Sequence, residues 1–410
     1  MTHTDRRSFL VQTGGLLAAA ALVPSSAAAH VFRAGAAVGI GVIGTGRQGR
    51  NILSELGKLE AARIVAVCDT DDLRLRGGQR RASDSKAYSS ASDLIADPGV
   101  EAVFIATPTH RHRAMVEEAV AAGKHVYCEA PIAHTVEDSR AIARAAAGSS
   151  KVVQFGYEGR ANPVYSLARS FAVSGTLREL VSLHAQHHEK SSWRSPANDA
   201  AREKELNWKL DPEVSLGLEG ETGAVQLDVH EWFINKSPVR VSGHGSIRLH
   251  NDGRKMPDTV HLRLEYADGL VATYESSLAN SYGGRYEILH GADATMKLAW
   301  SHGWMFKEAD APTQGWEVYA NRQQFHNDEG ITLIADATKL ASQGKLKEGV
   351  GLPYSSTYYA VEAFLKSVLE GAKVVTDPGD AHRSTVVGIA AHEAVSTGKA
   401  IDITDAMMAL

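Results

Sequence analysis

Short apolar runs alternate with amphipathic stretches of helical length over residues 36–156. Apolar runs at 38–43 and 64–68 flank a stretch of helical periodicity that follows Gly49, and further apolar runs lie in VEAVFIATPT, HVYCEAP and KVVQFGY. Apolar runs of this length predict buried strands, and strands that alternate with helices predict a parallel sheet. We therefore expect residues 36–156 to form a doubly wound α/β domain of the Rossmann type.

From residue 157 onwards the pattern changes to runs with strand-like alternation. They are VRVSGHGSIRL, TVHLRLEYADG, LVATYESSLA and RYEILHGADATMKLAW, and the turns ADGL and HGADA between them suit hairpins. Two later segments, YYAVEAFLKSVLEGA and AHRSTVVGIAAHEAVSTG, have helical periodicity. Residues 157–410 are therefore expected to form an α+β domain with an antiparallel or mixed sheet.

The first residues have the pattern of an export signal. Arg6 and Arg7 precede a short apolar stretch at 16–23 and a run of alanines. This predicts a twin-arginine signal over residues 1–29 and a mature periplasmic protein that begins near His30. The apolar stretch is too short to span a bilayer, so stable membrane insertion is not expected after cleavage, with an uncleaved anchor as the alternative. Twin-arginine export carries folded proteins, which suits a cofactor bound before export.

The composition favours a small-molecule ligand. The chain of 410 residues is 44% hydrophobic and 22% charged, which is typical of a globular protein. A net charge of -5 and the lack of a long basic run argue against nucleic acid. Cys68 and Cys128 end two apolar runs, so we expect both to be buried as small hydrophobic residues, with a disulfide between them as the alternative.

A glycine motif follows the first apolar run. Gly44, Gly46 and Gly49 form G-x-G-x-x-G between a predicted strand and a predicted helix, and Asp69 ends the second strand twenty residues later. In this arrangement the backbone approaches a pyrophosphate at the helix N-terminus, and the acid accepts hydrogen bonds from the adenosine ribose. The alternative is a tight turn with a solvated acid. The pattern predicts a dinucleotide site.

Charges near this motif bear on the choice of dinucleotide. Asp69 favours NAD, because a 2'-phosphate would meet a carboxylate, whereas Arg47, Arg74 and Arg76 leave NADP open.

Two more strand ends belong to the same edge of the predicted sheet. ATPTHRH and CEAP each end a strand, and ligands of doubly wound sheets bind at the carboxyl ends of strands. Glu129 is therefore expected to face the nicotinamide, with a loop-capping carboxylate as the alternative. The predicted cofactor contacts are Gly44, Thr45, Gly46, Arg47, Gln48, Gly49, Asp69, Thr107, Pro108, His112 and Glu129.

An ordered set of segments resembles the Gfo/Idh/MocA oxidoreductase family. The set comprises GVIGTGRQG, VAVCD, IATPTHRH, AGKHVYCEAPIAHT, GYEGRANP and residues 217–243. The resemblance implies an N-terminal Rossmann domain, a C-terminal α+β domain on an open, mostly antiparallel sheet that often mediates oligomers, and oxidation of sugars or cyclitols by hydride transfer. It also implies a tightly bound nicotinamide cofactor and a homo-oligomer.

Two positions depart from the family pattern. The family motif Glu-Lys-Pro has Ala130 in place of lysine, and the second motif keeps Glu221 and Asp228 but has Val225 where a histidine is expected. A methyl or isopropyl group cannot transfer a proton, and general acid-base catalysis contributes about 10²–10⁴-fold in rate. His230 is a possible substitute for the histidine, with a structural histidine as the alternative.

Aromatic and charged groups gather in LHAQHHEKSSWRSP, and Trp208 follows in ELNWKL. An indole face beside hydrogen-bonding groups suits a pyranose ring, and a solvated loop anchored by Trp193 is the alternative. His187 and His188 should face opposite ways in a strand, and the resemblance favours His188. No metal-ligand spacing occurs among the 18 histidines, so no metal is expected.

The candidate residues lead to one functional hypothesis and two alternatives. We expect an NAD(P)-dependent oxidoreductase that acts on a sugar, polyol or glycoside. The alternatives are an NAD-dependent glycoside hydrolase or lyase that works by transient oxidation, and a non-catalytic relative that binds nucleotide and sugar. The catalytic candidates are Glu129, Tyr157, His188, Glu221 and Asp228, and the substrate candidates are His188, Trp193, Arg194, His230 and Tyr282.

Overall fold

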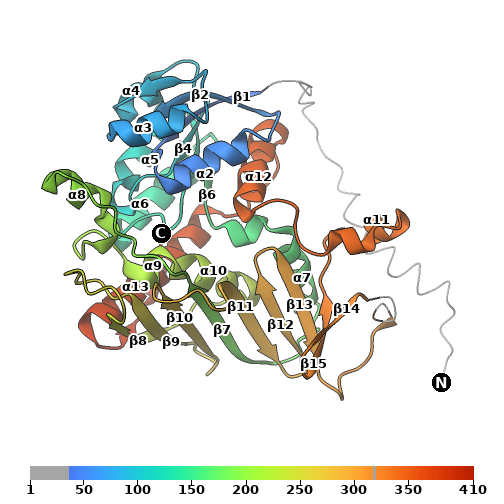
Figure 1. Ribbon diagram of the computed structural model, residues 1–410. Coiled ribbons are helices and arrows are strands. Elements are labelled where there is room, and N and C mark those ends of the chain that lie inside the picture. Colours follow the sequence, from blue (N-terminus) through green and yellow to red (C-terminus); the bar gives the residue numbers. More distant parts are fainter. Residues whose placement is uncertain (1–36, 316, 318–319) are drawn as a thin grey trace. The chain divides into compact units, whose positions relative to one another are not determined.

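The computed structural model describes residues 37–410 apart from 316, 318 and 319 (Figure 1). The expected export signal and its paired arginines lie outside the described residues. Within the described ranges, no helix has the length and apolar character needed to cross a bilayer.

The first domain is built on a parallel sheet with the strand order β3-β2-β1-β4-β5-β6. Its central strands are buried on both faces because helices cover both sides, which explains their continuous apolar sequences. The predicted Rossmann sheet is confirmed. The strands are β1 Val38–Ile43, β2 Ala62–Cys68, β3 Lys86–Tyr88, β4 Ala102–Ile105, β5 His125–Cys128 and β6 Val153–Phe155, and the helices are α2 Arg47–Leu56, α3 Asp72–Gln79, α4 Ala91–Ala96, α5 His112–Ala121 and α6 Val136–Ala147.

The second domain contains a ten-stranded sheet with the order β14-β15-β13-β12-β11-β7-β10-β9-β8-β16. Among the described strands, β7 and β10 pair in parallel and the other neighbours are antiparallel. The predicted hairpins are present, and Gly269 provides the left-handed φ of +88° in the turn between β9 and β10. The strands are β7 Leu180–His188, β8 Arg240–Ser246, β9 Thr259–Glu265, β10 Val271–Ser277, β11 Arg285–Gly291, β12 Ala294–Ala299, β13 His302–Lys307, β14 Arg322–Phe325, β15 Asp328–Thr332 and β16 Ile401–Asp402.

Helices cover one face of this sheet (Figure 1). Leu183 and Ala185 of β7 pack in one apolar core with Leu227 of α10 and Val387 of α13. The remaining helical segments are α7 Pro163–Val173, α8 Ala200–Leu206, α9 Gly217–Glu221, α10 Gly223–Ile234, α11 Ala337–Ser342, α12 Ser356–Glu370, α13 Pro378–Thr397 and α14 Asp405–Met408, with short 3-10 turns η2 Thr109–Arg111, η3 Glu158–Ala161, η4 Trp208–Leu210 and η6 Leu346–Gly349.

Helix α12 belongs to the core of the first domain although it lies late in the chain. Phe364 packs edge-on against Phe104 of β4, with ring centroids 5.1 Å apart, and against Tyr127 of β5 at 5.9 Å. The C-terminal part of the chain therefore completes the N-terminal core. Cys68 and Cys128 are buried and free, which confirms the expectation from the sequence.

A buried ion pair joins the segment after β6 to the helices of the second domain. The Arg160 guanidinium donates to both carboxylate oxygens of Asp228, at 2.8 to 3.1 Å, and to Asp380 of α13 at 2.5 Å. Ser384 also donates to Asp228, at 2.6 Å. Asp228, a catalytic candidate from the sequence, is fully buried, bonds to Arg160 and Ser384, and does not line the cavity described below.

We predict that Asp228→Asn destabilises the fold by about 3–5 kcal/mol, because Arg160 is then left buried with one carboxylate partner fewer. Asp268→Asn is the matched control, because Asp268 forms an exposed ion pair with Lys236 and its loss should cost under about 1 kcal/mol. Urea unfolding of both variants measures the difference. Equal losses would contradict the structural role of Asp228.

Candidate functional site

A cavity of about 840 Å³ lies at the carboxyl edge of the parallel sheet. One wall consists of residues that follow β1, β2, β4, β5 and β6, and the other comes from the second domain, including residues 191–195, Glu221 and Val225. Its volume is within the range of small-molecule sites. The carboxyl edge is where the sequence predicted a ligand.

The glycine motif shapes one end of this cavity. Gly44 has a φ of +88°, and a Cβ there would lie 2.6 Å from the carbonyl oxygen of Ala106. A Cβ on Gly46 would meet no protein atom within 4 Å, although Gly46 lines the cavity. Helix α2 begins at this point without a side-chain cap or an acid in its first turn, so its N–H groups are free to bind an anion. These features fit the pyrophosphate of a dinucleotide.

Gly49 packs closely against the backbone of the glycine loop, and Thr45 links that loop to Asp69. A Cβ on Gly49 would lie 1.8 Å from the carbonyl oxygen of Gly44, so only glycine permits this approach. Asp69 accepts a hydrogen bond from the backbone N–H of Thr45 at 2.8 Å and also lines the cavity. Each carboxylate oxygen has more than one acceptor site, so Asp69 can still bind a ribose hydroxyl. Thr45 is buried, and its role is to fix Asp69.

The loop after β4 contributes Thr107, Pro108 and His112 to the cavity wall, as predicted. The ring nitrogens of His112 lie 3.0 Å from the carbonyl oxygen of Thr107 and 3.2 Å from that of Ile132. Burial lowers the pKa of His112 to about 4, so the ring is neutral at physiological pH. His112 therefore ties the loop after β4 to the loop after β5.

Glu129 and Ala130 line the cavity where β5 ends. The side chain of Gln48 donates a hydrogen bond to Glu129 at 3.3 Å. Burial, together with the negative charge of Glu158, raises the pKa of Glu129 to about 8. Glu129 therefore keeps its proton in much of the protein at neutral pH, and the methyl group of Ala130 beside it can neither accept nor donate one.

Glu221 and Val225 face the same cavity from α9 and α10. Glu221 accepts hydrogen bonds from Thr109 Oγ1 at 2.9 Å and from the backbone N–H of Leu216 at 3.2 Å. Burial raises its pKa. Ala130 and Val225 therefore lie in one cavity, and both have apolar side chains there.

A lysine that the sequence analysis missed lines the same cavity. Lys209, in η4, places its Nζ 4.7 Å from the centre of the Trp193 ring and 5.6 Å from that of Trp208. Burial lowers its pKa, while Glu221 and Glu129 act in the opposite direction. Its only sequence signal is the neighbouring tryptophan, and lysines are mostly solvated, so the pattern gave no reason to select it.

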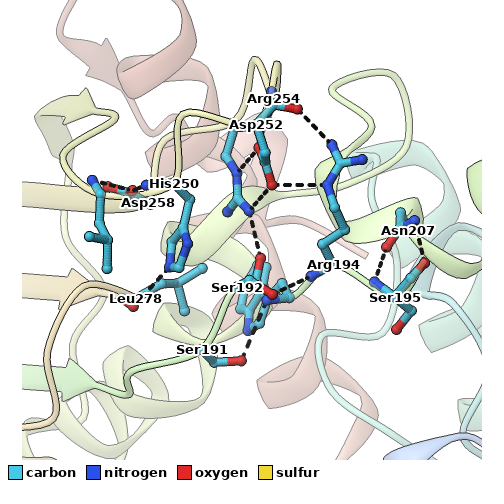
Figure 2. Close-up of polar contacts among 12 residues, drawn as sticks. Ser191, Ser192, Arg194, Ser195, Asn207, His250, Asp252, Arg254, Asp258 and Leu278 are labelled. Atoms are coloured by element: carbon cyan, nitrogen blue, oxygen red, sulfur yellow. Dashed lines mark hydrogen bonds and ion pairs between the residues drawn. The ribbon is translucent and has the colours of Figure 1, made fainter.

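Loop 191–195 contributes Trp193 and Arg194 to the cavity wall, as predicted. Figure 2 shows Asp252 between Arg194 and Arg254, and the Arg194 Nε lies 2.9 Å from the Asp252 carboxylate. Arg254 is buried and also donates to the carbonyl oxygen of Ser192 at 2.8 Å. Trp193 has a φ of +57°, which non-glycine residues rarely adopt, and these bonds hold the backbone there.

Ion pairs join the two walls near the cavity. Three of those in the described part of the chain link the first domain to residues 189–205. They are Arg47 with Glu189 at 3.1 Å, Asp71 with Arg202 at 2.6 Å and Arg111 with Glu205 at 3.1 Å.

The structure places His187 and His188 on opposite faces of β7. Neither histidine is among the residues that line the cavity, but His187 shares the face of β7 that packs against helices and is influenced by Lys209. Burial, with nearby positive charges, lowers the pKa of His187 to about 3. The ring of His188 contacts the carbonyl oxygen of Tyr282 at 3.2 Å, on the other face. Tyr282, a substrate candidate from the sequence, is 89% exposed and is not among the residues that line the cavity.

Tyr157 and His230 are likewise structural in this arrangement. The Tyr157 hydroxyl is buried against α13, 2.7 Å from Thr385 Oγ1 and 3.2 Å from the carbonyl oxygen of Ala381. His230 is fully buried on α10, and burial lowers its pKa to about 4. Neither lines the cavity. Helix α10 turns Val225 toward the cavity and His230 toward the sheet, where it meets the backbone of His184.

The described residues contain no group of three or more histidine, cysteine, aspartate or glutamate side chains arranged to hold a metal ion.

Comparison with known proteins identifies the family. A model of the oxidoreductase family with an NAD-binding Rossmann fold matches residues 38–157, and a model of the GFO/IDH/MocA C-terminal domain matches residues 165–297. Inositol 2-dehydrogenase 1 of Saccharopolyspora erythraea is 31% identical over 350 residues, which are 84% of this chain and 97% of that protein. The chain belongs to the Gfo/Idh/MocA oxidoreductase family, and its first domain is an NAD-binding Rossmann domain.

Two further similarities are informative. A solved structure of levoglucosan dehydrogenase in complex with NADH and L-sorbose matches with a TM-score of 0.72 at 18% identity, over 90% of this chain and 99% of that chain. It shares the fold. A glycosyl hydrolase family 109 protein of Shewanella amazonensis is 34% identical over 162 residues, which are 34% of this chain and 36% of that protein.

We predict that Gly46→Val weakens NAD binding on the order of 100-fold, about 2.8 kcal/mol. The new side chain would fill the space at the N-terminus of α2 that the pyrophosphate is expected to occupy. Gly57→Ala, at the other end of the same helix with a φ of -63°, is the control and should bind normally. Isothermal titration with NAD measures both. Unchanged affinity in Gly46→Val would place the dinucleotide elsewhere.

Proposed function

We propose that the protein oxidises a CH–OH group of a polyol or sugar with NAD as the hydride acceptor. The observation that carries this proposal is the convergence of the glycine loop, Glu129 and Glu221 on one cavity. The glycine loop fits a dinucleotide. Glu129 lies at the strand end where the nicotinamide of a Rossmann domain is expected, and Glu221 faces the same cavity from helix α9. The named relatives include an inositol dehydrogenase, and a levoglucosan dehydrogenase shares the fold.

The residues of this chain have separable roles in that reaction. Gly46 and the free N–H groups of α2 would hold the pyrophosphate, and Asp69 would accept hydrogen bonds from the ribose. When bound, NAD supplies the site that accepts hydride. Glu221, already fixed by Thr109, would orient a substrate hydroxyl by accepting its hydrogen bond.

The indole rings of the cavity suit the apolar face of a sugar or cyclitol ring, whereas Glu221 suits a hydroxyl. Trp193 and Trp208 both line the cavity, and an indole face packs well against the C–H face of a pyranose or cyclitol ring. Polar groups around them would bind the hydroxyls. This combination favours a carbohydrate over an apolar alcohol.

We also propose that the protein works in the periplasm as a homo-oligomer that holds its cofactor tightly. The paired Arg6 and Arg7 and the short apolar stretch that follows them support export by the twin-arginine machinery. The face of the large sheet that no described helix covers supports assembly through that surface (Figure 1).

The proposed function predicts that purified protein forms NADH, seen by absorbance at 340 nm, when NAD is mixed with a panel of polyols, free sugars and anhydrosugars. At least one compound should give a turnover of about 1 per second or more. Gly46→Val protein prepared in the same way is the control and should be strongly impaired. Tight NAD binding without NADH formation from any compound would contradict the proposal.

A second candidate is a glycosidase or lyase that oxidises its substrate transiently. Ala130 and Val225 favour it, because neither supplies the proton transfer of an ordinary dehydrogenase. The partial similarity to a glycosyl hydrolase family 109 protein also supports this second candidate.

This candidate predicts release of free sugar from a glycoside in the presence of NAD without net accumulation of NADH. Chromatography of the products, run beside the absorbance assay, separates the two activities. Accumulation of NADH in step with product would exclude transient oxidation, and release of sugar with no NADH would favour it.

A further inference from the structure

We propose that Lys209 is the catalytic base that removes the substrate hydroxyl proton, in place of the lysine that is absent at Ala130. This inference rests on the proposed oxidation of a CH–OH group. It moves the proton-accepting group from the strand end of the first domain to a short turn of the second domain, on the opposite wall of the same cavity.

The surroundings of the Lys209 amine suit this role. Its Nζ lies over the faces of Trp193 and Trp208, and in the described part of the chain no carboxylate comes within ion-pair distance of it. Lys204, four residues before the Trp208 indole, instead pairs with Asp211 at 3.6 Å. A lysine held over ring faces without a salt-bridge partner has no carboxylate that fixes its proton, so its neutral form can accept one from a ligand.

The acids of the cavity surround this amine without neutralising it. Glu221 on the same wall and Glu129 on the opposite wall both interact with Lys209 electrostatically, and all three line the cavity together with Ala130 and Val225. Burial lowers the pKa of Lys209, which raises the neutral fraction that can take a proton.

The carboxylates are less suitable as the first proton acceptor. Glu129, with a pKa of about 8, is largely protonated at neutral pH. Glu221 is already engaged by Thr109 Oγ1 and the backbone N–H of Leu216. Each can hold a substrate hydroxyl, and Lys209 in its neutral form is the group that can accept the proton.

Two hydrogen bonds join the segment that precedes Lys209 to the loop that contains Trp193. Asn207 accepts a hydrogen bond from the backbone N–H of Ser195 at 2.6 Å and donates to its carbonyl oxygen at 2.9 Å (Figure 2). This reciprocal pair joins η4 to loop 191–195, which Arg254 secures through Ser192. The backbone that carries Lys209 is therefore fixed beside the loop that carries Trp193, and the two indole rings lie beside its amine.

The step balances without a further reactant. The O–H bond of the substrate breaks, its proton passes to the neutral Lys209 amine, and its electron pair forms the C=O bond. The C–H bond breaks with its electron pair, which leaves as hydride to bound NAD. Products are a ketone, NADH and a protonated lysine that returns its proton to water.

The test compares Lys209→Met and Lys209→Arg with Lys190→Met, whose lysine is exposed and outside the cavity. Both Lys209 variants should lose about 10²–10⁴-fold in kcat with NAD affinity unchanged, because arginine keeps the charge but does not release its proton. The rise of kcat/KM with pH through the lowered lysine pKa should disappear in Lys209→Met. Restoring a lysine on the other wall, in Ala130→Lys with Lys209→Met, should recover part of the activity.

Normal kcat in Lys209→Arg would overturn the proposal while leaving the oxidoreductase function intact. A separate readout needs no substrate: reductive ¹³C-methylation followed by NMR titration should show one lysine with a lowered pKa, and its signal should be missing in Lys209→Met. If the signal that disappears in Lys209→Met titrates like the other lysines in the unmodified sequence, Lys209 is not the base, whether or not a substrate has been found.

Discussion

The buried ion pair between Arg160 and Asp228 sets the geometry on which the site depends. Arg160 follows β6 of the parallel sheet, whereas Asp228 lies on α10, on the same helix as Val225 and just beyond Glu221. A guanidinium that is removed from water must keep its carboxylate partners, so the helix cannot shift without a large cost. The pair therefore holds the second motif against the carboxyl edge of the sheet, where Glu129 lies.

The two walls of the cavity supply different groups to the site. The first domain supplies backbone N–H groups and Asp69 for a dinucleotide, and the second supplies indole faces and the Lys209 amine. In the family pattern a lysine and a histidine would occupy the places of Ala130 and Val225. Here those places are apolar, so acid-base chemistry has to come from groups that surround the vacant corner.

Much of the fold could be predicted because it follows from local periodicity. The boundaries of β1, the Rossmann alternation and the hairpin turns are all visible as repeating patterns in the sequence. The cavity residues at strand ends, such as Asp69 and Glu129, were predictable for the same reason, since carboxyl ends of parallel strands share one edge.

The placements that local patterns could not predict have a common physical cause. Tyr157 and Asp228 were selected for their chemistry, but their partners, Thr385 and Arg160, lie far away in the sequence and turn them into buried structural groups. Lys209 was overlooked because only the packing of η4 beside loop 191–195 brings its amine over an indole. Local patterns show which residues share an element, whereas tertiary packing decides which of them a ligand meets.

The most direct measurement is a crystal structure of the protein with NAD. We expect the pyrophosphate at Gly46 and the first turn of α2, and the nicotinamide ring at the corner formed by Glu129 and Ala130, facing Lys209. A dinucleotide bound outside this crevice, or one whose nicotinamide points away from that corner, would contradict the account.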